Sequence, residues 1–201
     1  MRLAAIVLAA GKSQRMGRNK LLLDLAGRPI LEWSLSALDA SALEEVIVVL
    51  GHKPDELRHL AEAHGAEVVL NPDYEEGMTS SVKAGLSRVS AEAAFIVLGD
   101  QPILEPQLLL RMVKAMEFDL EALVVSPVHL GRRGHPVLLR RVLFPEILSL
   151  GAGETLRGVV LGHEANHRMV EGGAWCVIDI DTPEDFERVR GLLEAGPFGP
   201  L

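Results

Sequence analysis

The sequence predicts an α/β fold with three layers, in which helices cover both faces of a mostly parallel central sheet. Short apolar segments of strand length alternate with amphipathic segments of helical length, as in strands joined by right-handed helical crossovers. A length of 201 residues with a hydrophobic fraction of 48% suits one domain with a sizeable core. We expect this domain to span residues 1–195, followed by a flexible tail at residues 196–201.

The first strand and helix lie at the start of the chain. Residues 3–8 are continuously apolar, as expected of a central parallel strand, and residues 21–25 predict a brief extended segment. Pro29 can open a helix, because proline is tolerated in the first helical turn. The predicted buried face of this helix comprises Ile30, Leu31, Ser34, Leu35 and Leu38.

The next units repeat this form. Residues 45–50 predict a strand, and the helix after it begins near Pro54 and ends at Gly65. A third strand is expected at residues 66–70, and the turn after it leads into a helix that ends near Val89. The alternative caps for the start of that helix are Thr79, Ser80 and Ser81.

Two further strands are predicted at residues 93–98 and 122–125, with an amphipathic helix between them. The buried face of this helix comprises Leu108, Leu109, Met112, Val113 and Met116. Beyond Ser126 the alternation is less regular. The remaining short elements are strands at residues 136–139, 167–170 and 175–180 and helical segments at residues 140–148 and 154–161.

The last helix has the clearest start. Thr182 can cap it, Pro183 occupies the first position, and Asp185 stands three residues after the cap, as in a capping box. Its predicted buried face comprises Phe186, Val189, Leu192 and Leu193.

Charge and cysteine content limit the class of function. The net charge of −8 disfavours binding to the phosphate backbone of nucleic acid. Cys176 is the only cysteine and lies in an apolar run, so we expect a buried thiol and no intramolecular disulfide. The apolar opening looks like a short signal peptide, but the basic residues after it favour a buried strand. No segment approaches the roughly 18 apolar residues of a membrane helix, and we expect a cytoplasmic protein.

The loop after the first strand, residues 8–20 (LAAGKSQRMGRNK), is the most informative stretch about function. Its basic residues are Lys12, Arg15, Arg18 and Lys20. Gly11 and Gly17 permit the left-handed backbone and close ligand approach that wrapping around a phosphate chain requires. The spacing fits neither the Walker A loop nor the dinucleotide fingerprint. This basic loop (residues 8–20) therefore predicts the binding of an anion.

Polar residues follow several predicted strands directly. Asn71, Asp100 and Asp181 each come after an apolar segment of strand length. In open parallel sheets, ligands bind beyond the carboxyl ends of the strands. We therefore expect these three side chains and the basic loop to face one crevice.

Asp100 and Asp181 are the candidate ligands of a magnesium ion. Mg²⁺ takes one or two carboxylates and completes its octahedron with phosphate oxygens and water. Each residue has a plainer interpretation as a turn or cap aspartate. Asp179 is an alternative second ligand, although Asp181 lies nearer the rim of the predicted sheet.

The basic loop resembles the opening of nucleotidyltransferases of the glycosyltransferase-A-like fold, whose consensus is close to LAAGxSxRMGxxK. Every fixed position of that consensus is present. The segments GDQP, GMTSSVKAG, RGHPVL and DIDTPEDF extend the resemblance to the molybdenum cofactor cytidylyltransferase group of the MobA-like nucleotidyltransferases. The resemblance runs from the first strand to the last helix and implies a Rossmann-like nucleotidyltransferase fold.

The same resemblance implies roles for individual residues. The nucleotide would be bound by Leu8, Ala9, Ala10, Gly11, Lys20, Asn71, Ser81, Gly99 and Asp100. The catalytic residues would be Arg15, Lys20 and Asp100, the acceptor would contact Gly134 and His135, and Mg²⁺ would be held by Asp100 and Asp181. Ala10 stands where guanylyltransferase relatives carry glycine, which favours CTP over GTP.

The implied reaction transfers CMP from CTP to the phosphate of molybdopterin or the molybdenum cofactor and releases pyrophosphate, with possible delivery of the product to a molybdoenzyme. A guanylyltransferase using GTP and a sugar-phosphate nucleotidyltransferase are alternatives on the same fold. A noncatalytic nucleotide-binding protein is an alternative of another class. Such a protein would need the basic loop but not two carboxylates, so Asp100 and Asp181 together favour an enzyme.

Residues 163–167 (HEANH) fit the HExxH pattern of zinc hydrolases. That pattern requires a helix on which both histidines bind zinc and the glutamate acts as base. Gly162 precedes the segment, a predicted strand follows it directly, and no third ligand is evident downstream. We therefore favour nucleotide transfer over zinc hydrolysis.

Overall fold

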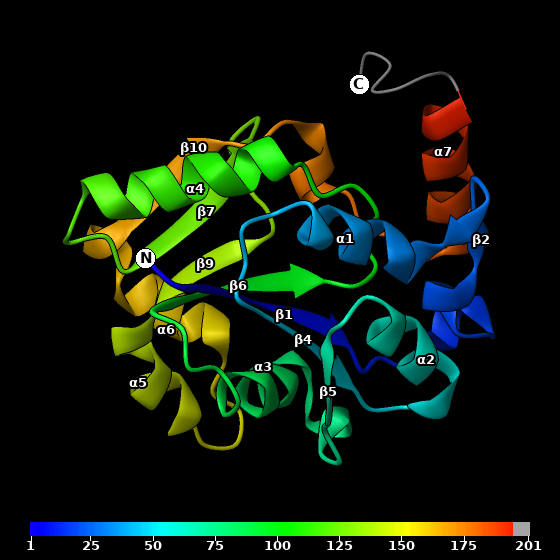
Figure 1. Cartoon of the computed structure of the whole chain (residues 1–201), viewed down its shortest axis with the longest axis horizontal. Coiled ribbons are helices and arrows are strands. Elements are labelled where there is room, and N and C mark those ends of the chain that lie inside the picture. The colour runs from blue at the N-terminus through cyan, green and yellow to red at the C-terminus, as the bar shows by residue number, and fades with distance from the viewer. Residues whose placement is uncertain (195–201) are drawn as a thin grey trace.

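The computed structural model describes residues 1–194, and Figure 1 shows a central sheet with helices on both of its faces. The tail predicted at residues 196–201 lies outside the described residues. Within residues 1–194, no helix combines the length and the apolarity needed to cross a lipid bilayer. That residues 1–195 form one domain stays a prediction.

The main sheet has the strand order β10-β7-β9-β6-β1-β4-β5. These strands are β1 (Leu3–Ala9), β4 (Glu45–Leu50), β5 (Glu67–Leu70), β6 (Ala93–Leu98), β7 (Val124–His129), β9 (Val137–Arg140) and β10 (His167–Glu171). All of them run parallel except β9, which pairs antiparallel with β6 and β7. The short β8 (Arg132–Arg133) also pairs antiparallel with β7.

Helices cover both faces because successive side chains of a strand point to opposite faces of the sheet. On β1, Ala5 and Val7 belong to one apolar cluster, and Ala4 and Ile6 belong to another. The first cluster includes residues of α1 (Ile30–Asp39), α2 (Asp55–Ala63), α4 (Pro106–Phe118) and α7 (Pro183–Glu194). The second includes residues of α3 (Met78–Leu86), α5 (Phe144–Leu148) and α6 (Leu156–Gly162). The predicted three-layer α/β fold is therefore confirmed.

Several short elements complete the chain. A two-stranded ribbon is formed by β2 (Asp24–Leu25) and β3 (Arg28–Pro29). The 3-10 turns are η1 (Gln14–Met16), η2 (Lys20–Leu22), η3 (Tyr74–Glu76), η4 (Arg141–Leu143), η5 (Glu164–Asn166) and η6 (Ala174–Val177). The extended segment predicted at residues 21–25 is thus extended only in its last part, and Pro29 lies just before α1 as its N-cap.

The start of α7 follows from its local sequence. Thr182 Oγ1 accepts a hydrogen bond from the Asp185 amide at 3.2 Å, and Asp185 Oδ2 accepts one from the Thr182 amide at 3.0 Å. This reciprocal pair is the predicted capping box. Of the predicted buried face of this helix, Val189 is fully buried, whereas Phe186, Leu192 and Leu193 are only partly buried. All five residues of the predicted face of α1 are buried.

The start of α3 differs from the prediction. None of Thr79, Ser80 and Ser81 caps this helix, because the N-cap position is occupied by Gly77, with a φ of 108°. A φ in that range favours glycine. Ser80 Oγ instead donates to the Gly77 carbonyl at 2.8 Å. The chain therefore enters the helix before its first hydroxyl residue.

The predicted strand at residues 175–180 is also wrong. Trp175 and Cys176 lie in η6, and the residues after them have no strand pairing. Their backbone groups bond to loops: the Cys176 carbonyl accepts from the His135 amide at 2.8 Å, and the Ile180 amide donates to the Asp100 carbonyl at 3.1 Å. The segment is apolar because Trp175, Cys176 and Ile180 are buried in the first apolar cluster. It leads the chain to Ile180, beside Asp100.

Most strand boundaries agree with the predictions. The strands at residues 45–50 and 93–98 have the predicted bounds. Besides the missing strand at residues 175–180, the largest difference concerns the strand predicted at residues 122–125, which begins at Val124 and continues to His129. Pro127, a residue that usually interrupts strands, is accommodated within β7, where its carbonyl accepts from the Gly134 amide at 2.9 Å.

Candidate active site

The basic loop leaves the sheet at the carboxyl end of β1 and turns back toward it. Gly17 has a φ of 65°, and its amide donates to the Gln14 carbonyl at 3.3 Å, which closes the turn. Ser13 Oγ accepts a hydrogen bond from the Lys20 amide at 3.1 Å. These two contacts bring the end of the loop, with Lys20, back beside its beginning.

Lys20 joins the two aspartates that lie far from it in sequence. Its ammonium nitrogen Nζ donates to Asp100 Oδ2 at 2.5 Å and to Asp181 Oδ1 at 2.7 Å. Arg15 Nη1 donates to the other oxygen of Asp181, Oδ2, at 3.0 Å. The lysine side chain is 13% exposed and that of Asp100 is 20% exposed. The structure thus brings together the cationic and acidic residues that the sequence placed in one crevice.

The protonation states in this cluster follow from its charges. Burial lowers the pKa of Lys20, but the charge of Asp100 and the hydrogen bonds to both aspartates outweigh burial and raise it. The hydrogen bond from Lys20 lowers the pKa of Asp181, and the charges of Lys20 and Arg15 act in the same direction. Burial raises the pKa of Asp179, and so do the charges of Asp100 and Asp181. The charge of Lys20 acts in the opposite direction on Asp179, but burial and the two neighbouring carboxylates outweigh it.

This donor set fits a divalent cation. Three carboxylates, those of Asp100, Asp179 and Asp181, line one cleft and offer the hard oxygen ligands that Mg²⁺ prefers. Within the described part of the chain, no group of three His, Cys, Asp or Glu residues is arranged as a complete metal site. A cation held here would therefore need oxygen ligands from a phosphate or from water, as Mg²⁺ usually does.

A cleft of about 670 Å³ extends from this cluster along the basic loop to the start of α3. Its lining includes the following residues that the sequence had indicated: Leu8, Ala9, Ala10, Gly11, Arg15, Lys20, Ser81, Asp100 and Asp181. Four other indicated residues, Asn71, Gly99, Gly134 and His135, do not line it. Gly99 instead packs closely, since a Cβ at that position would lie 2.9 Å from the Leu8 carbonyl oxygen.

Sequence reasoning missed residues on the wall that faces the basic loop. Tyr74, Glu75 and Met78 line the cleft, and Lys12 Nζ lies 2.5 Å from Glu75 Oε1 across its mouth. Tyr74, Glu75 and Met78 follow β5, and the sequence had already indicated Asn71 at the end of this strand. The strand-end rule therefore identified the loop, but nothing in the sequence showed which of its side chains turn inward.

Asn71 does not line the cleft, but its side chain bonds to Ser81, which does. Its side chain is buried, and Nδ2 donates to Ser80 Oγ at 2.8 Å and to Ser81 Oγ at 3.0 Å. Its Oδ1 accepts from the Asp73 amide at 3.0 Å. With these bonds made, the amide holds Ser81 in place at the cleft.

We expect Asn71→Ala to weaken nucleotide binding roughly tenfold, because the serine that it positions would move. Loss of buried hydrogen bonds should also lower the free energy of unfolding by about 1–3 kcal/mol. Nucleotide titration and urea denaturation measure these effects. Asn166→Ala is the control, since Asn166 bonds to the Glu121 carbonyl outside the cleft. Equal nucleotide affinity in Asn71→Ala and in the control would contradict the positioning role.

Gly134 and His135 do not line the cleft and instead contact the segment that carries Cys176. A Cβ at Gly134 would lie 2.0 Å from the Cys176 carbonyl oxygen. The His135 ring is largely buried, and this burial lowers its pKa. Burial likewise raises the pKa of Cys176 to about 11, as expected of an inert thiol. The predicted contact of Gly134 with an acceptor finds no support in this packing, and its small size serves close contact between two loops.

Gly134→Ala is therefore expected to lower the free energy of unfolding by about 1–3 kcal/mol through overpacking. Thermal and urea denaturation measure this loss. The matched control is Gly191→Ala in α7, where nothing lies within 4 Å of an added Cβ. If Gly134→Ala were as stable as the parent and the control, the close contact between Gly134 and Cys176 would be contradicted.

The HEANH segment does not form a zinc site. It comprises the C-cap residue of α6, the η5 turn and the first residue of β10, so no single helix carries it. His163 Nε2 lies 2.7 Å from Glu146 Oε2, and His167 Nε2 lies 2.9 Å from Ser126 Oγ. The two histidines are engaged with different partners, and the alternative of zinc hydrolysis is not supported.

We expect His167 to contribute to the pH dependence of stability. Burial lowers the pKa of its ring in the folded state, whereas the ring titrates near about 6.5 when the chain is unfolded. The contribution of His167 to stability is therefore fully present above the pKa of the unfolded state. It is lost as the pH falls below that pKa, because the unfolded state then binds a proton more readily than the folded state. Urea denaturation at about pH 7 and about pH 5 should show a smaller loss in His167→Gln than in the parent. An equal loss in both proteins would contradict this origin.

A mostly parallel sheet whose strand ends carry a basic glycine-containing loop and clustered carboxylates is typical of the nucleotide-binding proteins of the α/β class. The family model described as the MobA-like NTP transferase domain matches residues 5–184. The chain belongs to this family and is a nucleotidyltransferase.

Two curated relatives match nearly the whole chain. The molybdenum cofactor cytidylyltransferase of Escherichia coli is 33% identical, over 90% of this chain and 92% of the relative. The purine catabolism protein PucB of Bacillus subtilis is 32% identical, over 95% of this chain and 97% of the relative.

Solved structures agree with the fold. The homologue of Mycobacterium tuberculosis rv0371c from Mycobacterium sp. strain JC1 has a TM-score of 0.85 at 27% identity and covers 98% of this chain and 100% of that one. Rv0371C of M. tuberculosis in complex with manganese has a TM-score of 0.75 at 26% identity and covers 95% and 99%.

Proposed function

We propose that this protein transfers CMP from CTP to the terminal phosphate of molybdopterin or the molybdenum cofactor and releases pyrophosphate. The observation that carries the proposal is the contact of Lys20 with Asp100 and Asp181, at the end of a cleft lined by the basic loop. The similarity to the E. coli cytidylyltransferase supports this choice of nucleotide and acceptor. Ala10, which lines the cleft, supports CTP over GTP. We further propose a cytoplasmic enzyme whose product passes to a molybdoenzyme.

The cleft suits a substrate of this shape. At one end Tyr74, Gly77 and Met78 offer mostly apolar surface for a base, and Ser81 adds a hydroxyl. At the other end Lys20 and Arg15 present positive charge. A triphosphate would lie along the basic loop between these ends.

The reaction needs little acid or base catalysis. A phosphate oxygen of the acceptor is already ionised near neutral pH, so it can attack the α-phosphorus of CTP directly. A new phosphorus–oxygen bond forms as the bond to the bridging oxygen breaks, and the electron pair leaves with pyrophosphate. Both reactants are anions, so the role of Lys20 and Arg15 is to neutralise charge and to hold the phosphates in line.

Asp100 and Asp181 would hold Mg²⁺, with Asp179 behind them as a further source of negative charge. The bound ion would neutralise phosphate oxygens and polarise the reacting phosphorus. In this arrangement Lys20 would move from the carboxylates to the phosphates when substrate and metal are present.

A screen of the four ribonucleoside triphosphates with Mg²⁺ for thermal stabilisation tests the nucleotide choice, because selective binding raises apparent stability by mass action. We expect the largest shift with CTP. Release of pyrophosphate in the presence of CTP and molybdopterin then tests catalysis. Selective stabilisation by GTP would indicate a guanylyltransferase, and turnover with a sugar phosphate would indicate another acceptor. CTP binding without pyrophosphate release from any acceptor would indicate a noncatalytic nucleotide-binding protein.

A further inference from the structure

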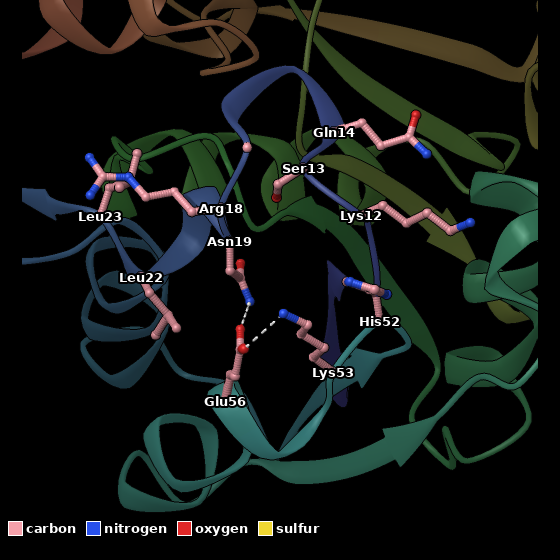
Figure 2. A pocket seen from close by; sticks show the side chains of 11 residues that line it. Lys12, Ser13, Gln14, Arg18, Asn19, Leu22, Leu23, His52, Lys53 and Glu56 are labelled. Atoms are coloured by element: carbon pink, nitrogen blue, oxygen red, sulfur yellow. Dashed lines mark hydrogen bonds and ion pairs between the residues drawn. The ribbon is translucent and has the colours of Figure 1, made fainter.

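The cluster of Lys20, Asp100 and Asp181 is built from three segments of the chain, and two of them have evident anchors. The basic loop, which carries Lys20, is joined to α2: Figure 2 shows Asn19 beside Glu56, with Nδ2 at 3.2 Å from Oε2. Asp100 lies two residues after the end of β6, in the middle of the sheet. Asp181 follows residues 172–180, none of which belongs to a strand, so its position depends on other contacts.

The contacts of Asp181 and its neighbours fix it only in part. The Asp181 amide donates to Asp185 Oδ2 at 3.3 Å, which orients it relative to α7 rather than to Asp100. One backbone bond, from the Ile180 amide to the Asp100 carbonyl at 3.1 Å, joins the two segments. Ile180 is buried in the apolar cluster, but apolar contact is not directional. The separation of the two carboxylates therefore needs a further, directed bond.

Gln101, the residue after Asp100, supplies such a bond. Its side chain is buried, and Nε2 donates to the Trp175 carbonyl at 2.7 Å. The carbonyl of Gln101 accepts a hydrogen bond at 2.9 Å from Oγ of Ser34, a fully buried residue of α1. Gln101 thus connects α1 and the loop of Asp100 to the start of the segment that leads to Asp181.

The amide of Gln101 is not fully satisfied. A carbonyl oxygen only accepts hydrogen bonds, so the amide nitrogen must face Trp175. Within residues 1–194, Gln101 Oε1 then has no hydrogen-bond partner, although it is buried. An unpaired buried acceptor lowers stability, and native proteins depart from full pairing of this kind mainly at functional sites. The cost favours a role for the Gln101–Trp175 bond at the site over a contribution to stability.

We propose that Gln101 is a positioning residue for metal binding, which sets the separation of the Asp100 and Asp181 carboxylates through its bond to the Trp175 carbonyl. The proposal rests on the proposed function, because it takes these two side chains as the metal ligands. Mg²⁺ demands nearly ideal octahedral geometry, so a small shift of Asp181 would weaken binding. Loss of a residue that orients metal ligands typically costs about 10–100-fold in metal affinity.

Titration calorimetry of the full chain with Mn²⁺, without CTP or acceptor, tests the proposal. Gln101→Met keeps the length of the side chain and removes the amide, and we expect it to weaken Mn²⁺ binding roughly tenfold or more. Hydrogen exchange of the Ile180 amide should also be faster, since its bond to Asp100 depends on the same anchor. The control is Asn166→Ala, which removes another bond from a side-chain amide to a backbone carbonyl, that of Glu121 outside the cleft. It should leave both measurements unchanged.

Unchanged Mn²⁺ affinity in Gln101→Met would overturn the proposal even if exchange were faster, because Gln101 would then have a structural role only. Equal weakening in Asn166→Ala would overturn it too. A parent protein that bound no Mn²⁺ would refute the metal role of the two aspartates and this proposal with it. Failure of the proposed metal site is thus seen in the parent, whereas failure of the positioning role alone is seen in the variant.

A second variant covers misfolding of Gln101→Met, which thermal denaturation would reveal. Gln101→Asn keeps the amide but is one methylene shorter, too short to reach the Trp175 carbonyl. We expect it to weaken Mn²⁺ binding in the same way, and parent-like affinity in a folded Gln101→Asn protein would equally overturn the proposal.

Discussion

Asp100→Asn is expected to lower kcat for pyrophosphate release by roughly 10³-fold, because a metal ion contributes several kcal/mol of charge stabilisation in such reactions. The substitution keeps the volume of the side chain and an oxygen that can accept the bond from Lys20, which lies 2.5 Å away. The fold should therefore persist while the anionic ligand is lost. Pyrophosphate release at increasing Mg²⁺ concentration measures the effect.

Asp55→Asn is the matched control for Asp100→Asn. Asp55 lies at the start of α2, and its side chain is 95% exposed, so this variant should keep the parent activity and magnesium dependence. An Asp100→Asn protein that retained both would remove Asp100 from the mechanism. A partial loss reversed by more Mg²⁺ would instead assign Asp100 to metal affinity alone.

The sequence predicted the strands well where apolar character and sheet pairing coincide. β4 and β6 are buried on both faces, so their apolar runs end where the strands end. The segment around Trp175 is equally apolar, but its backbone bonds to loops. Apolarity reports burial, and burial in a loop leaves the same pattern as burial in a sheet. The amino-acid pattern of a segment therefore cannot distinguish a buried strand from a buried loop.

The sequence predicted those residues of the candidate site whose position follows from the order of the strands. Lys20 and Asp100 follow the ends of adjacent parallel strands, β1 and β6, so their meeting follows from the strand-end rule. The rule does not account for the position of Asp181, since no strand ends directly before it: β10 ends at Glu171. The interactions of Asn71 and Gly134 depend on side-chain and backbone packing between distant segments, which periodicity does not encode.

Lys20→Met is expected to have two large effects, one on stability and CTP binding and one on metal binding. Loss of a lysine with a purely structural role would not produce both. The variant keeps most of the side-chain length and loses the charge, so three carboxylates would face one another without the ammonium group. We expect the metal-free protein to lose about 1–3 kcal/mol of unfolding free energy, less than for a fully buried pair because Asp181 is 37% exposed. CTP should bind more weakly and transfer should slow, since the charge that meets the phosphates is gone.

The second effect of Lys20→Met concerns the metal and separates the proposed role from simple loss of packing. With the ammonium group removed, the carboxylates should attract a divalent cation more strongly, and Mg²⁺ or Mn²⁺ alone should restore more stability to the variant than it adds to the parent. Thermal denaturation with and without each ion measures this difference, and Lys114→Met on α4 serves as the control. A variant that the ions stabilise no more than the parent would show that Lys20 does not occupy the position of a cation. In that case the carboxylates would be a purely structural anchor for the basic loop.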